Sequence, residues 1–536
     1  MKKRIRIFAT VIALILSVSV FSSCINIFIP VSMWDGEQLK FTLTASDVSE
    51  AETLLSEAKS ATLNGSALSS NQKWNDFLYS YYNIVTQYNM ATVSYYGDLK
   101  NEGYKSNYLF ANSAYLDLYA KYLSALKEIY NSSKRDSFFS GWTEEDLSII
   151  LYYDDEVSAL EEENDLLLTE YDSLTEEEFY DGSIEIYQQM LKNYDKIADK
   201  FGYDNYYDYA TKEVYGREYG EVERSIYRNK VAQNVVPISQ NLFMKQGEEI
   251  LGLTTAELGV INAIIYEDYD AEKTLNYYDR YVSSYTGSTK EALSHAFANK
   301  NFYMTDNPDA QGTAFTVYMP TYNEPFCFFG PNYQDVFTVI HELGHYYAYL
   351  YSGLENLPMD LNEVHSQANE MLLLEYLNTE LDEKLYGALE SSVIAETVST
   401  VLVGAIVDSV EEKVYDLPPD QITSQKIDEI IDEVCSRFGG KEYVNNTVFG
   451  NVGVYKYFRM TAIRQPIYYL SYSTSATTVL AFYVEAKENS ASAREKYRKL
   501  IEESNVDATF SEALQTAGFK TPFEDSTYTL IESLAR

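Results

Sequence analysis

The sequence predicts a mainly helical protein, and three observations support this fold class. Only 24 glycines and 11 prolines are spread over 536 residues, so few positions favour the tight turns that join short strands. Leucine, glutamate and alanine, which favour helices, are abundant. Apolar residues also recur at three- and four-residue spacing along much of the chain, as on the buried face of a helix. With 46% hydrophobic residues, the chain can bury a large core.

The charge of the chain argues against a nucleic-acid-binding protein. The formal net charge is -40, and no basic stripe appears outside the N-terminus. Such a surface favours solubility and attracts cationic or neutral partners. We therefore expect no nucleic acid among the partners.

The N-terminus is typical of an export signal. The basic segment MKKRIR is followed by an apolar run from Ile7 to Phe21 and by the small residues Ser22 and Ser23. Cys24 comes next, and the arrangement resembles a bacterial lipoprotein signal, in which cleavage leaves this cysteine as the lipid-modified first residue. The alternative is an uncleaved membrane anchor, because INIFIPVSM continues the apolar character. Both interpretations place the bulk of the protein outside the cytoplasm, attached to the cell membrane.

Three regions are expected along the chain. Residues 1–23 would be the signal peptide, residues 24–199 an N-terminal helical lobe, and residues 200–536 a second helical domain. Within the lobe, the acidic stretch before residue 183 contains a helical pattern with a predicted break at Asp181-Gly182. Cys327 and Cys435 are expected to be buried thiols, because a single pair does not form a disulfide framework.

One region of the second domain predicts strands. In GTAFTVYMPTYNEPFCFFG, apolar residues alternate from Phe315 to Met319, a turn follows at residues 322–325, and a second apolar run ends at Phe329. This pattern predicts a hairpin or a small sheet. A helix should follow, with Asn332 as its N-cap and Gly353 as its stop. A second helix should begin at Asp360, and one more should lie between Pro419 and Gly439, before a last helical block from about Val452.

The first of these helices carries HELGH, which places two of the four histidines four residues apart. On a helix, the side chains of His341 and His345 lie about 5 to 6 Å apart between Cβ atoms, so both rings can reach one metal ion. They fall beside the apolar stripe of the helix and need not belong to the core. Glu342 follows the first histidine, where a carboxylate can take a proton from a metal-bound water.

A catalytic zinc ion needs a third protein ligand and one open position. The helix after Pro358 offers Glu363, which shares a face with Glu370, seven residues further on. His365 points about 200° away from Glu363 on that helix. We expect Glu363 to be the third ligand and Glu370 to orient a ligating histidine through its other ring nitrogen. In the alternative, Glu363 forms a capping box with Asp360, and one carboxylate cannot fill both roles.

The strings DVFTVIHELGH and NEVHSQANEMLLLEYL resemble the oligoendopeptidase F and thimet oligopeptidase family of zinc peptidases. GYDNYYDYATKEVYGREY and LQTAGFKTPFED extend the likeness over about residues 200 to 536. The resemblance implies a two-lobed helical zincin with a small sheet beside the HExxH helix and a deep substrate cleft. It assigns residues 200–536 as the catalytic domain and implies one zinc ion per chain on His341, His345 and Glu363, with Glu342 as the catalytic base.

The sequence departs from the family pattern in two places. The connection between His345 and Glu363 is shorter than expected, and the family's histidine before a tyrosine-rich segment is missing from AIRQPIYYLSYSTSA. In the family, that histidine and a tyrosine stabilise the oxyanion. We expect a phenol here to do part of this work, with Tyr468 and Tyr472 as candidates, Tyr469 as a third, and Arg464 or Gln465 as substitutes. Helix packing is the alternative role of these tyrosines.

The expected function is therefore hydrolysis of short peptides at the cell surface by a zinc metalloendopeptidase. The strand from Gly312 to Met319 would pair with the backbone of the substrate. Two alternatives stay open. One is a surface peptide-binding lipoprotein that keeps the zinc site with weak or lost catalysis, and the other is a structural zinc scaffold.

Overall fold

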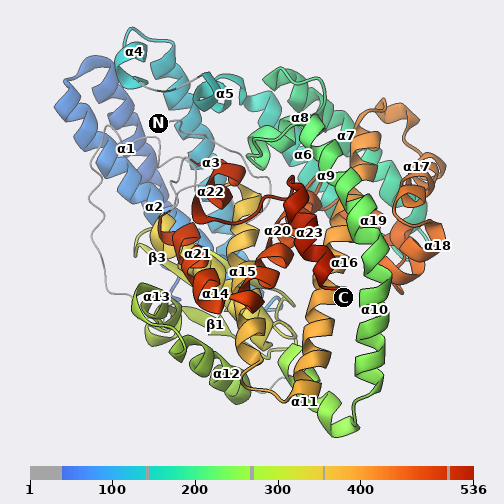
Figure 1. Ribbon diagram of the computed structural model, residues 1–536. Helices are drawn as coiled ribbons and strands as arrows, with labels where there is room; N and C mark the ends of the chain where they lie inside the picture. The colour runs from blue at the N-terminus through green and yellow to red at the C-terminus, as the bar shows by residue number, and fades with distance from the viewer. Residues whose placement is uncertain are drawn as a thin grey trace. The chain divides into compact units, whose positions relative to one another are not determined.

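A computed structural model describes residues 39–140, 142, 144–265, 271–353, 357–503 and 508–535. The predicted signal peptide and Cys24 lie outside the described residues. The predicted helical character is confirmed: 74% of the described residues are helical, and they include one small three-stranded sheet (Figure 1).

The chain forms two compact units, and each takes two separate stretches of sequence. The first unit contains the described residues within 1–152 and 259–356, and the second contains those within 153–258 and 357–536. The boundary predicted between residues 199 and 200 does not coincide with any of these changes. It falls where α7 (Phe179–Phe201) packs against α8 (Tyr206–Tyr209), inside the second unit.

The first unit contains three long helices near its N-terminus. α1, α2 and α3 pack against one another, and Figure 1 shows α1 and α2 side by side in blue. Their contact is rich in aromatic rings, such as Trp74 and Tyr122 with centroids 5.9 Å apart. The helices of this unit are α1 (Ala45–Asn64), α2 (Ala67–Gly97), α3 (Glu102–Tyr130), α4 (Arg135–Phe138), α5 (Glu144–Tyr152), α12 (Ala271–Ser283), α13 (Gly287–Ala298) and α14 (Val336–Ser352).

The predicted hairpin is confirmed and forms most of the sheet. β2 (Ala314–Met319) pairs antiparallel with β3 (Glu324–Phe329), and β1 (Phe302–Met304) pairs parallel with β3 on its other side. Asn323 closes the turn in the left-handed region, with φ 55°. Alternate side chains of β2 and β3 form a core with Met90 and Val93 of α2. α14 also packs against β2 and β3, so the sheet lies beside the HExxH helix as predicted.

The second unit is helical throughout its described residues. α11 (Thr255–Ile265) spans the point where the chain leaves it for the first unit. Its other elements are α6 (Asp155–Asp172), α7, α8, α9 (Glu221–Lys230), α10 (Val236–Leu251), α15 (Met359–Leu377), α16 (Glu383–Tyr415), α17 (Ser424–Arg437), α18 (Lys441–Tyr443), α19 (Val454–Thr461), α20 (Tyr469–Glu488), α21 (Ser490–Glu502), α22 (Phe510–Ala517) and α23 (Asp525–Ser533), with the π-helices η1 (Ala210–Val214), η2 (Val231–Val235) and η4 (Val444–Val448) and the 3-10 helix η3 (Pro419–Gln421).

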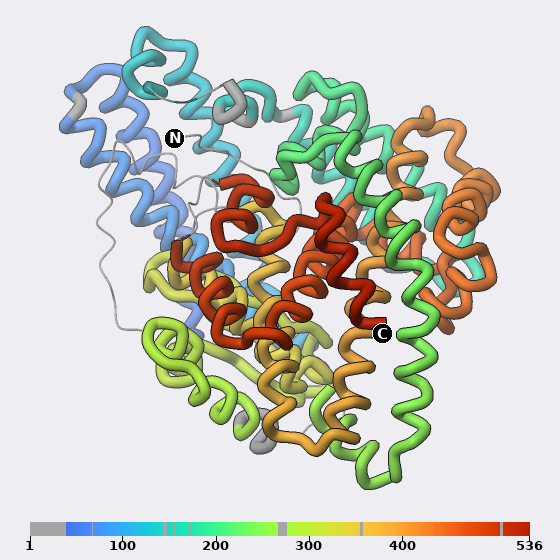
Figure 2. Tube along the Cα trace, viewed as in Figure 1, coloured from blue at the N-terminus to red at the C-terminus, as the bar shows by residue number. Residues whose placement is uncertain are grey.

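α20 is the central helix of this unit, because it packs against both α15 and α16. The C-terminal helices α21 and α22 cover α15, and α23 packs on α20 (Figure 2). Among the described helices, α16 alone is long and apolar enough to cross a membrane, but 72% of its most apolar window is buried inside the protein. It is therefore a core helix of this unit.

The predicted break at Asp181-Gly182 is wrong. The chain leaves its helix after Asp172, and Gly182 lies within α7. The break falls at residues 173–178, where Glu178 accepts hydrogen bonds from the backbone N–H and the hydroxyl of Thr175. The predicted helix after the double proline is confirmed as α17, and the C-terminal helical block begins with α19.

Gly404 of α16 allows α16 and α20 to approach closely, and this yields a prediction. A Cβ atom at Gly404 would lie 2.4 Å from the carbonyl oxygen of Tyr469 and 2.6 Å from Cβ of Ser473. Gly404→Ala should therefore lower the free energy of unfolding by about 1 to 3 kcal/mol, as overpacking does. Gly247→Ala is the control, because Gly247 is an exposed helical position with no atom within 4 Å of the added Cβ. It should raise stability by about 0.5 to 1 kcal/mol in urea denaturation. Equal stability changes in the two variants would contradict this packing.

Candidate metal centre

The HExxH helix, α14, begins at a cap different from the predicted one. Asp335, and not Asn332, is its N-cap, and its carboxylate accepts a hydrogen bond from the N–H of Thr338 at 3.0 Å. Asn332 has φ 65° and so lies in a turn before the helix. The helix ends at Gly353 as predicted, with φ 61°.

His341 and His345 lie on one side of α14, beside its buried stripe. Both are half-buried, whereas Val339, Ile340 and Leu343 are fully buried. Their ring centroids are 5.0 Å apart and the rings are inclined by 79°. The predicted separation of the histidines from the apolar stripe is confirmed, and the two rings can approach a common ion.

Glu342 is held by the sheet. Only 5% of this residue is exposed. The hydroxyl of Thr316 on β2 donates to Glu342 Oε2 at 2.7 Å and also lies 3.1 Å from the Glu342 carbonyl oxygen. The same hydroxyl is 3.4 Å from Sγ of Cys327, whose pKa is raised by burial and by the nearby Glu342 carboxylate. The carboxylate of Glu342 therefore has a fixed position next to the first histidine.

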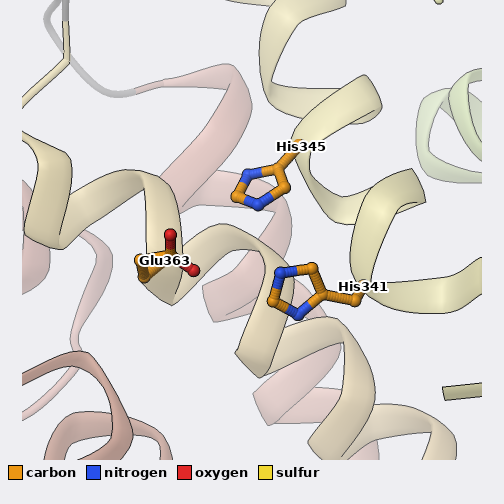
Figure 3. Close-up of side chains that lie close together, drawn as sticks. All are labelled: His341, His345 and Glu363. Atoms are coloured by element: carbon orange, nitrogen blue, oxygen red, sulfur yellow. The ribbon is translucent and has the colours of Figure 1, made fainter. Parts of the chain in front are cut away.

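Glu363 on α15 joins the two histidines. One ligand atom from each of His341, His345 and Glu363 lies within 4.8 Å of the others, and Figure 3 shows both imidazole rings and the carboxylate facing one another. The alternative role of Glu363 in a capping box is not found: Pro358 is the N-cap of α15 and no side chain caps it. Asp360, the predicted cap, lies in the first turn of α15, and it is fully buried.

These three residues are a suitable donor set for zinc. Two imidazoles and one carboxylate bind Zn²⁺ in catalytic sites, which keep a further position for water or substrate. The half-buried histidines and the buried Glu363 would provide this set without a fourth protein ligand. The side chains present here therefore fit the ion that the sequence predicts.

Two tyrosines lie next to Glu363. The hydroxyl of Tyr468 donates to Glu363 Oε1 at 3.1 Å and lies 3.2 Å from the hydroxyl of Tyr472. Burial is the largest cause that raises the pKa of Tyr468, and Tyr472 and Glu363 raise it further. The phenol therefore keeps its proton near neutral pH and can donate it in a hydrogen bond. Tyr469 instead contacts Tyr457, with ring centroids 5.9 Å apart.

The other candidates lie in different surroundings. His365 is 1% exposed, both of its ring nitrogens lack a hydrogen-bond partner, and burial lowers its pKa to about 3. It is a neutral core histidine and is not in the group with Glu363, in agreement with the predicted direction of its side chain. Arg464 is exposed, with its guanidinium 5.0 Å from the centroid of the Tyr171 ring. Glu370 is half-buried on α15, and its expected role in orienting a histidine stays a prediction.

No protein-family profile matches the sequence, and no curated protein matches it. Solved protein structures, in contrast, do match this chain. PZ peptidase A, solved with an inhibitor, superposes with a TM-score of 0.72 at 16% identity, over 93% of this chain and 99% of that one. A protein described as an oligoendopeptidase F, from Bacillus anthracis, has a TM-score of 0.69 at 16% identity, over 94% and 97% of the two chains.

This chain has the fold of the oligoendopeptidase F peptidases. The fold predicted from the family resemblance is thereby confirmed. An M32 carboxypeptidase from Deinococcus radiodurans shares the fold more distantly, with a TM-score of 0.52 at 10% identity over 91% of this chain and 98% of that one. Because more than one kind of peptidase has this architecture, the chemistry must be argued from the side chains.

Sequence reasoning missed the residues that hold the candidate site in place. Thr316 could have been found, because the alternation of β2 puts it on the opposite face from Phe315 and Val317. Arg217 and Tyr219 lie in the segment GYDNYYDYATKEVYGREY, which resembles the family. No local pattern predicts their hydrogen bonds to Asp360 of α15, because Asp360 lies more than 140 positions away in sequence.

Zinc binding is predicted to depend on the group of His341, His345 and Glu363. Glu363→Gln and His341→Ala should each weaken zinc binding by more than the roughly 10- to 100-fold that loss of an outer hydrogen-bond partner costs. His295→Asn is the control, since this histidine contacts Tyr346 and Asn299 and is not in the group. Zinc content after dialysis, with affinity measured against a competing chelator, checks this. One tightly held zinc ion in His341→Ala would contradict the assignment.

Proposed function

We propose that this protein is a zinc metalloendopeptidase that hydrolyses short peptides. The observation that supports it most is the meeting of His341, His345 and Glu363 ligand atoms within 4.8 Å, with the buried Glu342 next to the first of them. The solved structures that share this fold are described as peptidases, which supports peptide hydrolysis as the reaction. One zinc ion per chain is the proposed cofactor.

Each residue has a separate role in the proposed reaction. A zinc ion on the three ligands would supply Lewis acidity, which polarises the scissile carbonyl and makes water acidic enough to attack it. Glu342 accepts the proton of the attacking water and delivers it to the leaving amine. Thr316 keeps the Glu342 carboxylate in one orientation through its 2.7 Å hydrogen bond. The base is therefore positioned before the substrate arrives.

Tyr468 and Tyr472 are the proposed hydrogen-bond donors to the oxyanion. The family's histidine is absent from this segment, but the Tyr468 hydroxyl already lies 3.1 Å from Glu363. A phenol in that place can turn toward the negative charge that develops on the carbonyl oxygen. Loss of one such donor typically costs about 2.7 to 4 kcal/mol of transition-state stabilisation.

The free edge of β2 is the proposed binding site for the substrate backbone. The strand order β1-β3-β2 leaves one side of β2 without a neighbouring strand among the described residues. Gly330 donates to the Thr313 carbonyl, which fixes the register so that Ala314 and Thr316 direct their N–H and C=O groups away from β3. An extended peptide added there would be bound mainly through its backbone, so its sequence would matter little.

Endopeptidase activity is preferred over carboxypeptidase activity because the strings DVFTVIHELGH and NEVHSQANEMLLLEYL resemble the oligoendopeptidase F family. The proposed location is the outer face of the cell membrane, through a lipid on Cys24, and the proposed partners are short peptides and no nucleic acid. The net charge of -40 suits cationic peptides in particular.

Replacement of the base tests the proposal. Glu342→Gln should lower kcat by about 10²- to 10⁴-fold while one zinc ion per chain stays bound, because the amide keeps the shape and loses the basicity. The measurement combines zinc content with cleavage of a quenched fluorescent peptide library. Zinc bound to the native protein without hydrolysis of any peptide would instead favour a binding lipoprotein. Unfolding on removal of zinc, with no hydrolysis, would favour a structural zinc scaffold.

The Thr316 hydrogen bond yields a second prediction. Thr316→Val should lower kcat by about 10- to 150-fold with little change in KM, because a hydrogen bond to a charged group contributes about 1.5 to 3 kcal/mol. Thr313→Val is the control, since the hydroxyl of Thr313 bonds only a backbone carbonyl at the start of the strand. Steady-state kinetics on a single cleaved peptide distinguish the two variants. An equal effect of both would mean that Thr316 does not position the base.

A further inference from the structure

A buried polar cluster in the second unit connects α15 to the turn before α20. We name it the Arg217 cluster, and its members are Arg217, Tyr219, Asp360, Ser471 and Thr474. The side chains of Arg217 and Asp360 are both 0% exposed. Charges removed from water to this extent are costly unless each is paired and hydrogen-bonded. Such a pair is therefore expected to have a specific structural role.

Asp360 accepts hydrogen bonds from four side chains. Arg217 Nε donates to Oδ1 at 3.2 Å, and the Ser471 hydroxyl donates to the same oxygen at 2.5 Å. Oδ2 accepts from Thr474 Oγ1 at 2.9 Å and from the hydroxyl of Tyr219. Two of the donors belong to α20, so the carboxylate fixes α15 to α20 at this level. Glu363 follows Asp360 by three residues, which is about one turn along the same helix.

Arg217 also holds the turn that carries Tyr468. Its Nη2 donates to the Ile467 carbonyl oxygen at 3.0 Å and to Ser471 Oγ at 2.8 Å. Two further contacts bind the same turn. The N–H of Ile467 donates to Glu411 Oε1 at 2.6 Å, and the hydroxyl of Tyr215 donates to the Pro466 carbonyl at 2.5 Å.

The backbone of this turn is strained. Ile467 has φ 63°, in the left-handed region that a β-branched residue rarely adopts. Its side chain is fully buried. A strained conformation of this kind persists only where the surrounding contacts determine it. Here the contacts are those from Arg217, Glu411 and Tyr215, and the next residue in the chain is Tyr468.

The Arg217 cluster thus fixes the backbone on both sides of one hydrogen bond in the candidate site, that between Tyr468 and Glu363. Through Asp360 it fixes the helix that carries Glu363, and through Arg217 it fixes the turn that carries Tyr468. The hydroxyl of Tyr468 lies 3.1 Å from Glu363 Oε1. We propose that Arg217 and Asp360 are positioning residues that set the place of the Tyr468 hydroxyl relative to Glu363. This inference rests on the proposed function, in which that hydroxyl stabilises the oxyanion.

A double-mutant cycle tests the inference. Arg217→Lys keeps a positive charge for Asp360 but cannot reproduce the contacts of a planar guanidinium with several acceptors. It should lower kcat by about 10- to 100-fold, below the 10²- to 10³-fold of a lost oxyanion donor, with KM little changed and one zinc ion retained. In a Tyr468→Phe background it should lower kcat no further, because both changes remove the same contribution. Additive losses would overturn the inference.

The matched control is a second buried pair in the same unit. Arg228 and Asp408 are 3% and 0% exposed and lie 2.9 Å apart, and the ion pairs of Arg228 are with Asp408 and Glu412. Arg228→Lys should leave kcat within about 3-fold of the native value and be additive with Tyr468→Phe. If Arg217→Lys does not fold, Ser471→Ala replaces it. That variant keeps the ion pair, removes the two hydrogen bonds of the Ser471 hydroxyl, to Asp360 and from Arg217, and should show the same non-additivity at smaller size.

A measurement that does not depend on catalysis tests the role of Arg217 separately from the proposed function. Tyr468 is replaced with 3-fluorotyrosine, and its fluorine NMR resonance is recorded. One narrow resonance is expected in the native protein and in Arg228→Lys, and a shifted or additional resonance in Arg217→Lys or Ser471→Ala. An unchanged resonance in those two variants would overturn the positioning role. Absence of peptide hydrolysis by the native protein would overturn the proposed function, while the resonance would still decide the role of Arg217.

Discussion

The burial of one carboxylate, Asp360, constrains how α15 packs against α20 in the second unit. An ion in such a place carries a desolvation cost of several kcal/mol, even after relaxation. Its four hydrogen-bond donors come from the segment after η1 and from α20, and they make the burial tolerable. Two buried hydroxyl residues of α20, Ser471 and Thr474, supply donors where α15 approaches. Gly404 of α16 leaves room for Ser473 of α20.

Two polar groups of the candidate site, Glu342 and Glu363, lie on helices, and a third, Tyr468, lies on a turn that buried hydrogen bonds fix. Glu342 is held by a strand through Thr316, and Glu363 lies on a helix that is fixed one turn earlier at Asp360. Tyr468 follows a backbone conformation that is itself strained. Preorganised groups of this kind lose little entropy when a reaction begins, which is the usual basis of electrostatic catalysis. The aromatic and apolar packing around them provides stability, while the buried hydrogen bonds provide position.

Much of this arrangement could be predicted from the sequence, because it depends on local periodicity. The four-residue spacing of His341 and His345, the alternation in β2 and the phase of Glu363 on its helix each follow from repeat geometry. The misplaced cap at Asn332 and the misplaced break at Asp181-Gly182 concern helix ends, where several polar residues compete for the same role. The division into two units was not predictable, because each unit combines two stretches that are separated in sequence by the stretches 153–258 or 259–356 of the other unit.

The Arg217 cluster illustrates the same limit. Nothing near Asp360 in sequence distinguishes a buried carboxylate from a cap, and the structure alone brings Arg217 to it from 143 positions away. Likewise, the left-handed conformation of Ile467 contradicts the preference of a β-branched residue. Local rules fail at such positions because tertiary contacts override them, and these are often positions of functional importance.

The most direct test of the account is peptide hydrolysis by the purified protein before and after removal of its metal. Cleavage of a quenched fluorescent peptide library is measured on the native protein, after dialysis against a chelator, and after addition of one equivalent of zinc. We expect hydrolysis to be lost with the metal and restored by zinc, since the residues of the site supply a base and an oxyanion donor but no Lewis acid. Hydrolysis that persists at full rate without bound metal would contradict it.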